Sequence, residues 1–150
     1  MTPEQRNRAA SALWGEDEAT SDQMQAALLI ARKMKFRPKT VMGLDDEHKA
    51  RYLASVPDPP EDLAARLLIV YHLAEQRPMM GAFLDGLGIA HDDGLIRDDN
   101  VTPDEAKVGA AAAALANAYP AADVSIYLNT LLCQDPKTWG ALAGLGPLQA

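Results

Sequence analysis

The sequence predicts an all-α protein made of one domain over residues 1–150. Helix-start signals recur along the chain: Thr2-Pro3-Glu4-Gln5, Thr20-Ser21-Asp22-Gln23 and Thr102-Pro103-Asp104-Glu105 each offer a capping side chain before an apolar run. No stretch alternates apolar and polar residues between hairpin turns, as a strand would. A chain of 150 residues is typical of a single domain with its own core. We therefore expect six to eight helices packed as antiparallel hairpins, in a bundle or a short helical array, with no sheet.

The longest apolar helix is predicted over Pro60–Gln76. Asp58 can cap its start, and the prolines that follow suit a first helical turn. Only Arg66 and His72 interrupt the apolar and small residues between Leu63 and Ala74. A helix that is apolar on most faces must be covered on most faces, so we expect it to lie buried at the centre of the domain.

Helices are also predicted on either side of this central one. The first ends near Trp14, and the second is expected to turn one stripe toward the core, formed by Met24, Ala27, Leu28, Ala31 and Met34. A short helical turn over Lys39–Met42 and a helix from Asp45 follow. Beyond the centre we expect a short helix from Met79, an alanine-rich helix, a helix rich in leucine and a last short helix bearing Trp139.

Three short segments look alike: Arg37-Pro38, Arg77-Pro78 and Asp135-Pro136 each follow a long apolar helix and begin a short one. Their spacings of about 40 and 58 residues lie in or near the range of helical arrays. The alternative is that proline simply ends one helix and starts the next. The unequal spacing favours this second interpretation.

Composition excludes several classes of function. The formal charge of −7 argues against non-specific nucleic-acid binding, which needs a basic surface. No apolar run approaches the roughly 18 residues that span a bilayer, so we expect no membrane partner. Cys133 is the single cysteine and no leader-like segment opens the sequence, so we expect a reducing, cytoplasmic setting.

One basic cluster stands out in this acidic chain. It consists of Arg32, Lys33, Lys35, Arg37 and Lys39. Such cations favour the negative C-terminal end of the preceding helix. They could instead hold an anionic ligand or an acidic peptide.

The acidic loop from His91 to Asn100 is the candidate metal site. Calcium and magnesium prefer several converging carboxylate and carbonyl oxygens, and the candidate ligands are His91, Asp92, Asp93, Asp98 and Asp99. The register does not fit an EF-hand, because placing Gly94 at the sixth loop position leaves no carboxylate at the first and twelfth. The alternative is a solvated turn held to the body by Leu95 and Ile96.

The three histidines, His48, His72 and His91, could together contribute to a metal-dependent hydrolase. None has the i, i+4 His pair or the Glu-x-x-His spacing that would make such a signal specific. His72 is more typical of a histidine at the edge of a core. The sequence leaves open whether the chain is an enzyme.

Other chemistry has weaker support. Cys133 ends an apolar helix, where the negative dipole end disfavours a thiolate, so we expect an unreactive packing residue. No nucleophile elbow, phosphate-binding loop or cofactor motif is present. Trp14 and Trp139 lie at the ends of the first and last helices and could anchor an interface or cover the core. The leading hypothesis is a non-catalytic interaction or self-association module that binds a protein partner or a second copy. A divalent-metal protein using the acidic loop is the alternative.

Overall fold

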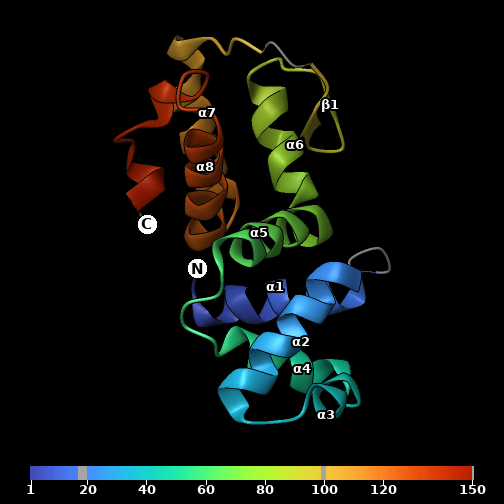
Figure 1. Ribbon diagram of the computed structural model, residues 1–150. Coiled ribbons are helices and arrows are strands. Elements are labelled where there is room, and N and C mark those ends of the chain that lie inside the picture. The colour runs from blue at the N-terminus through green and yellow to red at the C-terminus, as the bar shows by residue number, and fades with distance from the viewer. Residues whose placement is uncertain (17–19, 99–100, 150) are drawn as a thin grey trace. The chain divides into compact units, whose positions relative to one another are not determined.

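The computed structural model describes residues 1–16, 20–98 and 101–149 (Figure 1). The described residues form eight α-helices and one small two-stranded sheet, which confirms the all-α class and the number of helices. The chain divides into two compact units, Met1–Glu75 and Gln76–Ala150. The expected single domain stays a prediction. No described helix combines the length and the apolar character that crossing a membrane requires.

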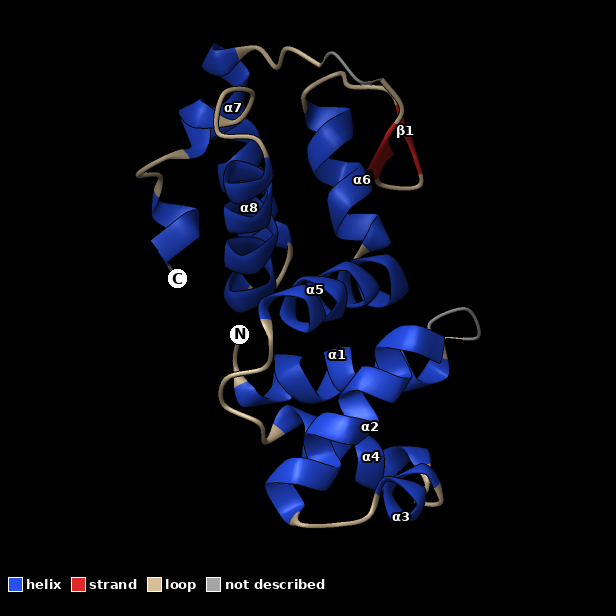
Figure 2. Ribbon diagram, in the orientation of Figure 1, coloured by secondary structure: helices blue, strands red, loops and turns tan. Residues whose placement is uncertain are grey.

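Unit 1 contains five helices: α1 (Pro3–Gly15), α2 (Thr20–Met34), α3 (Pro38–Met42), α4 (Asp46–Ala54) and α5 (Glu61–Glu75). Helix α1 packs against α4 and α5, while α2 packs against α3, α4 and α5. Leu13, Ile30 and Leu63 are fully buried where these helices meet. Loops are the only other structure in the described part of this unit (Figure 2).

Local capping explains where the helices of unit 1 begin. The Thr2 hydroxyl accepts a hydrogen bond from the Gln5 backbone N–H (3.1 Å), and the Gln5 side chain accepts one from the Thr2 N–H (2.9 Å). This reciprocal arrangement is the predicted capping box. Asp45 likewise caps α4 by accepting from the His48 N–H.

Helix α5 is covered on only part of its surface. Leu63, Val70, Tyr71 and His72 are buried, whereas Ile69 is 40% exposed. The prediction that this helix would be covered on nearly all faces is therefore wrong at Ile69.

Unit 2 contains α6 (Arg77–Gly86), β1 (His91–Asp92), β2 (Leu95–Ile96), α7 (Glu105–Ala118) and α8 (Ala121–Gln134), followed by short 3₁₀ helices over Gly140–Leu142 and Gly146–Gln149. Helix α7 packs against α6, α8 and both 3₁₀ helices. The Phe83 ring contacts the rings of Tyr127 and Trp139 at centroid distances of 5.8 and 5.9 Å. Burial raises the pKa of Tyr127, because the apolar core disfavours the charged phenolate.

The expected absence of a sheet is wrong at one place. Strands β1 and β2 pair antiparallel, with His91 opposite Ile96 and Asp92 opposite Leu95. The turn between them, Asp93-Gly94, has positive φ values of 51° and 92°. Asp-Gly is a preferred sequence for a two-residue hairpin turn with this twist. Each strand has only two residues, too few for strand-like alternation to be visible in the sequence.

The three proline-led segments differ in form. After Arg37 the helix has five residues, and after Arg77 it has ten. After Asp135 the chain makes turns and a 3₁₀ helix, so the short α-helix predicted there is wrong in type.

Candidate interaction surface

Helix α2 buries a different face from the one predicted. Of the predicted core stripe, Ala27 and Ala31 are buried, but Met24, Leu28 and Met34 are 48%, 45% and 40% exposed. The face turned inward is made of Ala26, Ala27, Leu29, Ile30 and Ala31. Apolar residues occupy so much of this helix that two rotations about its axis fit the helical period. The rotation observed buries the adjacent Leu29 and Ile30 together with three alanines, whose small side chains permit close packing.

The exposed side of α2 carries an ordered stripe. Met24, Leu28 and Arg32 are four residues apart, so they lie on one face of the helix. We call these three residues the α2 stripe. Successive members are about 6 Å apart along the helix axis, given a rise of 1.5 Å per residue. The stripe is therefore apolar over its first two positions and cationic at the third.

The chain beyond α2 adds a further exposed apolar side chain, Met42. Lys35 adopts a left-handed conformation with φ 57°, and the Phe36 N–H donates to the Ala31 carbonyl oxygen (3.0 Å), which ends the helix. Helix α3 then packs against α2. It buries Val41 and leaves Met42 44% exposed. Of seven large apolar side chains found exposed in the described residues, four lie on α2 and α3.

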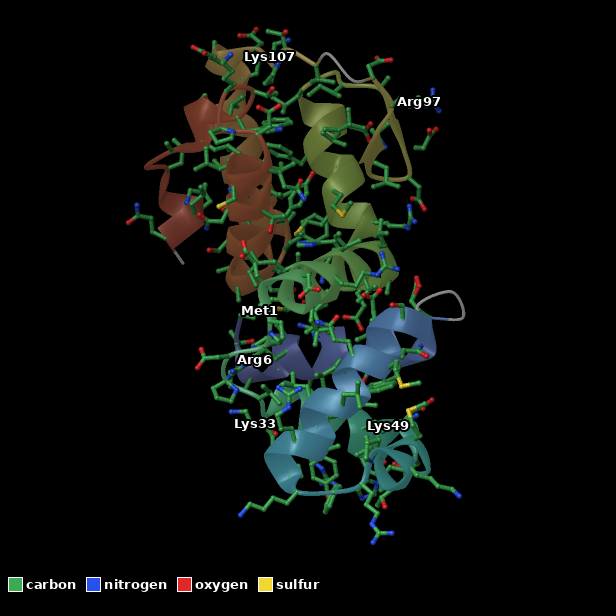
Figure 3. The ribbon with its side chains drawn as sticks, viewed as in Figure 1. Met1, Arg6, Lys33, Lys49, Arg97 and Lys107 are labelled. Carbon is green, nitrogen blue, oxygen red and sulfur yellow. The ribbon has the colours of Figure 1, made fainter. Side chains whose placement is uncertain are left out.

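The five cations of the basic cluster are all exposed. Within the described part of the chain, none of them forms an ion pair with a carboxylate. Other cations of unit 1 do: Arg8 pairs with Glu75, Lys49 with Asp46 and Arg66 with Asp22. No acidic residue occurs between Asp22 and Asp45, so no carboxylate is close to the cluster in the sequence. Figure 3 shows Lys33 extending outward from the C-terminal half of α2.

His91 of the predicted metal loop is committed to contacts inside unit 2. Its Nδ1 accepts a hydrogen bond from the Gly94 N–H (3.0 Å), so the proton resides on Nε2, which donates to Asp85 Oδ1 (2.7 Å). Its ring also lies close to α6, where a Cβ placed on Gly81 would be 3.2 Å from Cε1. The imidazole thus fastens the hairpin to α6.

Two aspartates of the loop, Asp92 and Asp93, contact arginines. Asp92 accepts from Arg97 Nε (2.6 Å), and Asp93 lies 3.9 Å from Arg77 Nη1, which also donates to the Asp93 carbonyl oxygen. Asp98 is exposed, and Asp99 lies outside the described residues. No group of three His, Cys, Asp or Glu side chains among the described residues could hold a metal ion. With Asp99 outside that set, the complete metal site stays a prediction.

The other two histidines belong to unit 1. His48 Nδ1 lies 2.6 Å from Asp45 Oδ1 at the start of α4. His72 Nδ1 donates to the Leu68 carbonyl oxygen (2.8 Å) one turn earlier on α5. These contacts are local to each helix.

The two tryptophans lie in the cores of their own units. Trp14 is 7% exposed, and the Lys49 ammonium lies over its ring, 4.7 Å from the centroid, in a cation–π contact. Trp139 is 3% exposed beside Phe83. The exposed apolar surface of the chain therefore lies elsewhere, chiefly on α2 and α3. Cys133 is exposed at the end of α8, so the expectation that it packs in the core is wrong.

Comparison with known proteins gives no relative from which a function could be transferred. No family model, no curated protein and no solved structure matches the chain.

Proposed function

We propose that this chain is a non-catalytic protein-interaction module whose partner docks on the α2 stripe and on Met42. The observation that carries the proposal is the exposure of Met24 and Leu28 on one helix face, next to cations that have no carboxylate partner among the described residues. Methionine side chains are flexible and polarisable, which suits them to a surface that adapts to a partner.

The magnitudes favour a transient complex. Burying a Leu or Met side chain completely stabilises by about 1.5–3 kcal/mol. Met24 and Leu28 are already about half covered, so a partner that covers the rest gains roughly 1.5–3 kcal/mol from the pair. Association costs at least about 4 kcal/mol in lost freedom. The apolar pair therefore needs Met42 and the neighbouring cations as further contacts.

A crosslinking experiment tests the proposal. A photoreactive amino acid is placed at position 28, and as a control at position 95. Leu28 and Leu95 are exposed to nearly the same extent, 45% and 44%, but they belong to different units. We expect a crosslinked partner from position 28 and none from position 95. A product of twice the chain mass would identify a second copy as the partner.

Binding of the purified partner completes this test. We expect Leu28→Asp to abolish the binding and Leu95→Asp to leave it unchanged, because a carboxylate on the stripe opposes burial. Equal crosslinking from both positions, or unchanged binding by Leu28→Asp, would contradict the proposal.

A further inference from the structure

We infer that the segment docking on α2 is an acidic amphipathic helix, an inference that rests on the proposed function. Charge complementarity is the first argument. The basic cluster places five cations within eight residues of a chain with a net charge of −7. A partner that covers Met24 and Leu28 necessarily approaches Arg32 and Lys35, so carboxylates on that partner gain attraction and cations meet repulsion.

The dipole of α2 does not account for the whole cluster. Arg32 and Lys33 lie in the last turn of α2, where the negative helix end favours cations. Lys35 directly follows the last residue of α2, whereas Arg37 lies at the start of α3, where the positive helix end does not favour a cation. Arg37 precedes α3 without a side-chain capping bond. These cations are thus available to a ligand.

The available binding modes favour a helix. A peptide that adds a strand needs an open sheet edge, and the described part of unit 1 has no strand. A proline-rich peptide needs a groove lined with aromatic rings, whereas Phe36 and Tyr52 are half-buried and pack edge to face on each other. Two apolar anchors four residues apart on an exposed helix match the anchor spacing of a partner helix.

The order of the α2 stripe specifies the partner further. Arg32 lies about 6 Å beyond Leu28 along the axis, and Lys35 directly follows the last residue of α2. A partner helix should therefore carry two apolar residues one turn apart, with Asp or Glu four to eight residues further along.

Synthetic peptides test this inference. The probe is an 18-residue helix with leucines at i and i+4 and glutamates four to eight residues further along. The comparison peptides carry lysine in place of each glutamate, or the same residues in scrambled order. Binding is followed by fluorescence anisotropy, and the contact surface by amide chemical shifts of the full chain.

We expect the acidic peptide alone to bind, with shifts confined to residues 21–43. We expect its affinity to fall steeply as salt rises from about 25 mM to about 500 mM, since the Debye length shrinks from roughly 20 Å to below 5 Å.

Matched charge-reversal variants identify the cations. Arg32→Glu with Lys35→Glu should weaken binding of the acidic peptide at low salt by about tenfold or more. The control variant combines Lys107→Glu with Lys137→Glu, which makes the same change in net charge on exposed residues of unit 2. Its affinity for the acidic peptide should stay within about twofold of that of the parent chain. Lys107 is shown in Figure 3. Circular dichroism confirms that all variants are folded.

The outcomes separate this inference from the proposed function. Equal binding of the acidic and lysine peptides, or no effect of the double reversal at positions 32 and 35, would overturn the acidic helix. The proposed function would survive if Leu28→Asp still abolished binding of the crosslinked partner. The acidic-helix inference would also be overturned if the chain bound single-stranded RNA, or vesicles containing anionic lipid, more tightly than the acidic peptide. If Leu28→Asp has no effect on either ligand, both proposals fail.

Discussion

The two units use the same residue type in opposite ways. Met24, Met34 and Met42 in unit 1 are at least 40% exposed, whereas Met79 and Met80 in unit 2 are 1% and 5% exposed. Charge differs as well. Residues 1–75 hold ten cationic and twelve acidic residues, for a net charge of −2, and residues 76–150 hold four and nine, for −5. Neither apolar content nor net charge alone predicts where an exposed surface lies.

The difference follows from what covers each proline-led helix. An Arg-Pro pair lies at the start of both α3 and α6: Arg37 precedes α3, and Arg77 is the first residue of α6. The hairpin packs on α6 so closely that a Cβ on Gly94 would lie 2.9 Å from Met80 Cβ. Helix α3 has only five residues, and it buries Val41 while Met42 and the stripe on α2 stay open. Among the described residues of unit 1, no hairpin covers α3 as β1 and β2 cover α6.

The largest expected effect comes from truncating one methionine in each unit. Met79→Ala should lower the free energy of unfolding of unit 2 by about 2–5 kcal/mol, because it opens a cavity in a packed core. Met24→Ala should change the stability of unit 1 by less than about 0.5 kcal/mol, because the side chain is half exposed and can be replaced by water. Urea denaturation followed by circular dichroism measures both. If the two units unfold in separate transitions, the midpoint of the transition that a variant shifts is compared with the midpoint of the same transition in the parent chain.

Similar losses for Met79→Ala and Met24→Ala would contradict the comparison. They would mean that the methionines of unit 1 are as well packed as those of unit 2.

A second test measures how much the close packing of the hairpin on α6 contributes to stability. Gly94→Ala must place a Cβ at φ 92°, within 3.0 Å of the Arg77 carbonyl oxygen and closer still to Met80. Gly88→Ala has a similar positive φ of 69° but open space around the Cβ. Both substitutions carry the left-handed cost of about 1–2 kcal/mol. Gly94→Ala should lose about 1–3 kcal/mol more in chemical denaturation, because the hairpin must move off α6. Equal losses would show that this close approach is unimportant.

Much of the local structure could be predicted from the sequence. The capping box at Thr2, the cap at Asp45 and the proline starts at Pro38 and Pro78 are all found where expected. The turn at Asp93-Gly94 is equally local and was expected as a turn, whereas the pairing of β1 with β2 was not, because the strands are so short. The capping start expected at Thr102 is wrong, because α7 begins at Glu105 and Asp104 caps it by accepting from the Ala106 N–H.

The rotation of α2 could not be predicted in the same way. Its apolar residues fit two rotations about the axis, and only packing against other helices selects one of them. The candidate site was consequently found in halves. The basic cluster was visible in the sequence as a group of charges, whereas Met24 and Leu28 were assigned to the core. Arg32 belongs to both halves, because it lies one turn beyond Leu28 on the same face of α2.

The smallest expected effect concerns a hydrogen-bonded aspartate in each unit, Asp45 at the start of α4 and Asp135 in the turn after α8. Hydrogen bonds from the His48 backbone N–H (2.8 Å) and from the His48 side chain hold the pKa of Asp45 below its ordinary value of 3.8. Hydrogen bonds from the Thr138 hydroxyl and N–H likewise lower the pKa of Asp135 in unit 2. Because the folded pKa is lower than the unfolded one, the ionised carboxylate stabilises the fold above the unfolded pKa. This contribution is lost as pH falls through the folded pKa.

Asp45→Ala should therefore destabilise unit 1 at neutral pH, with a deficit relative to the parent chain that shrinks below about pH 3.9. Asp45→Asn keeps an acceptor for the His48 N–H but cannot ionise, so it should fall between the parent chain and Asp45→Ala at neutral pH. The same series at Asp135 should shift only unit 2. Urea midpoints across the acidic range measure these differences. A deficit for Asp45→Ala that stays constant down to the lowest pH at which the chain folds would mean that the ionised carboxylate contributes nothing to this cap. The two units would then differ in how their side chains pack and not in the contribution of an ionised carboxylate.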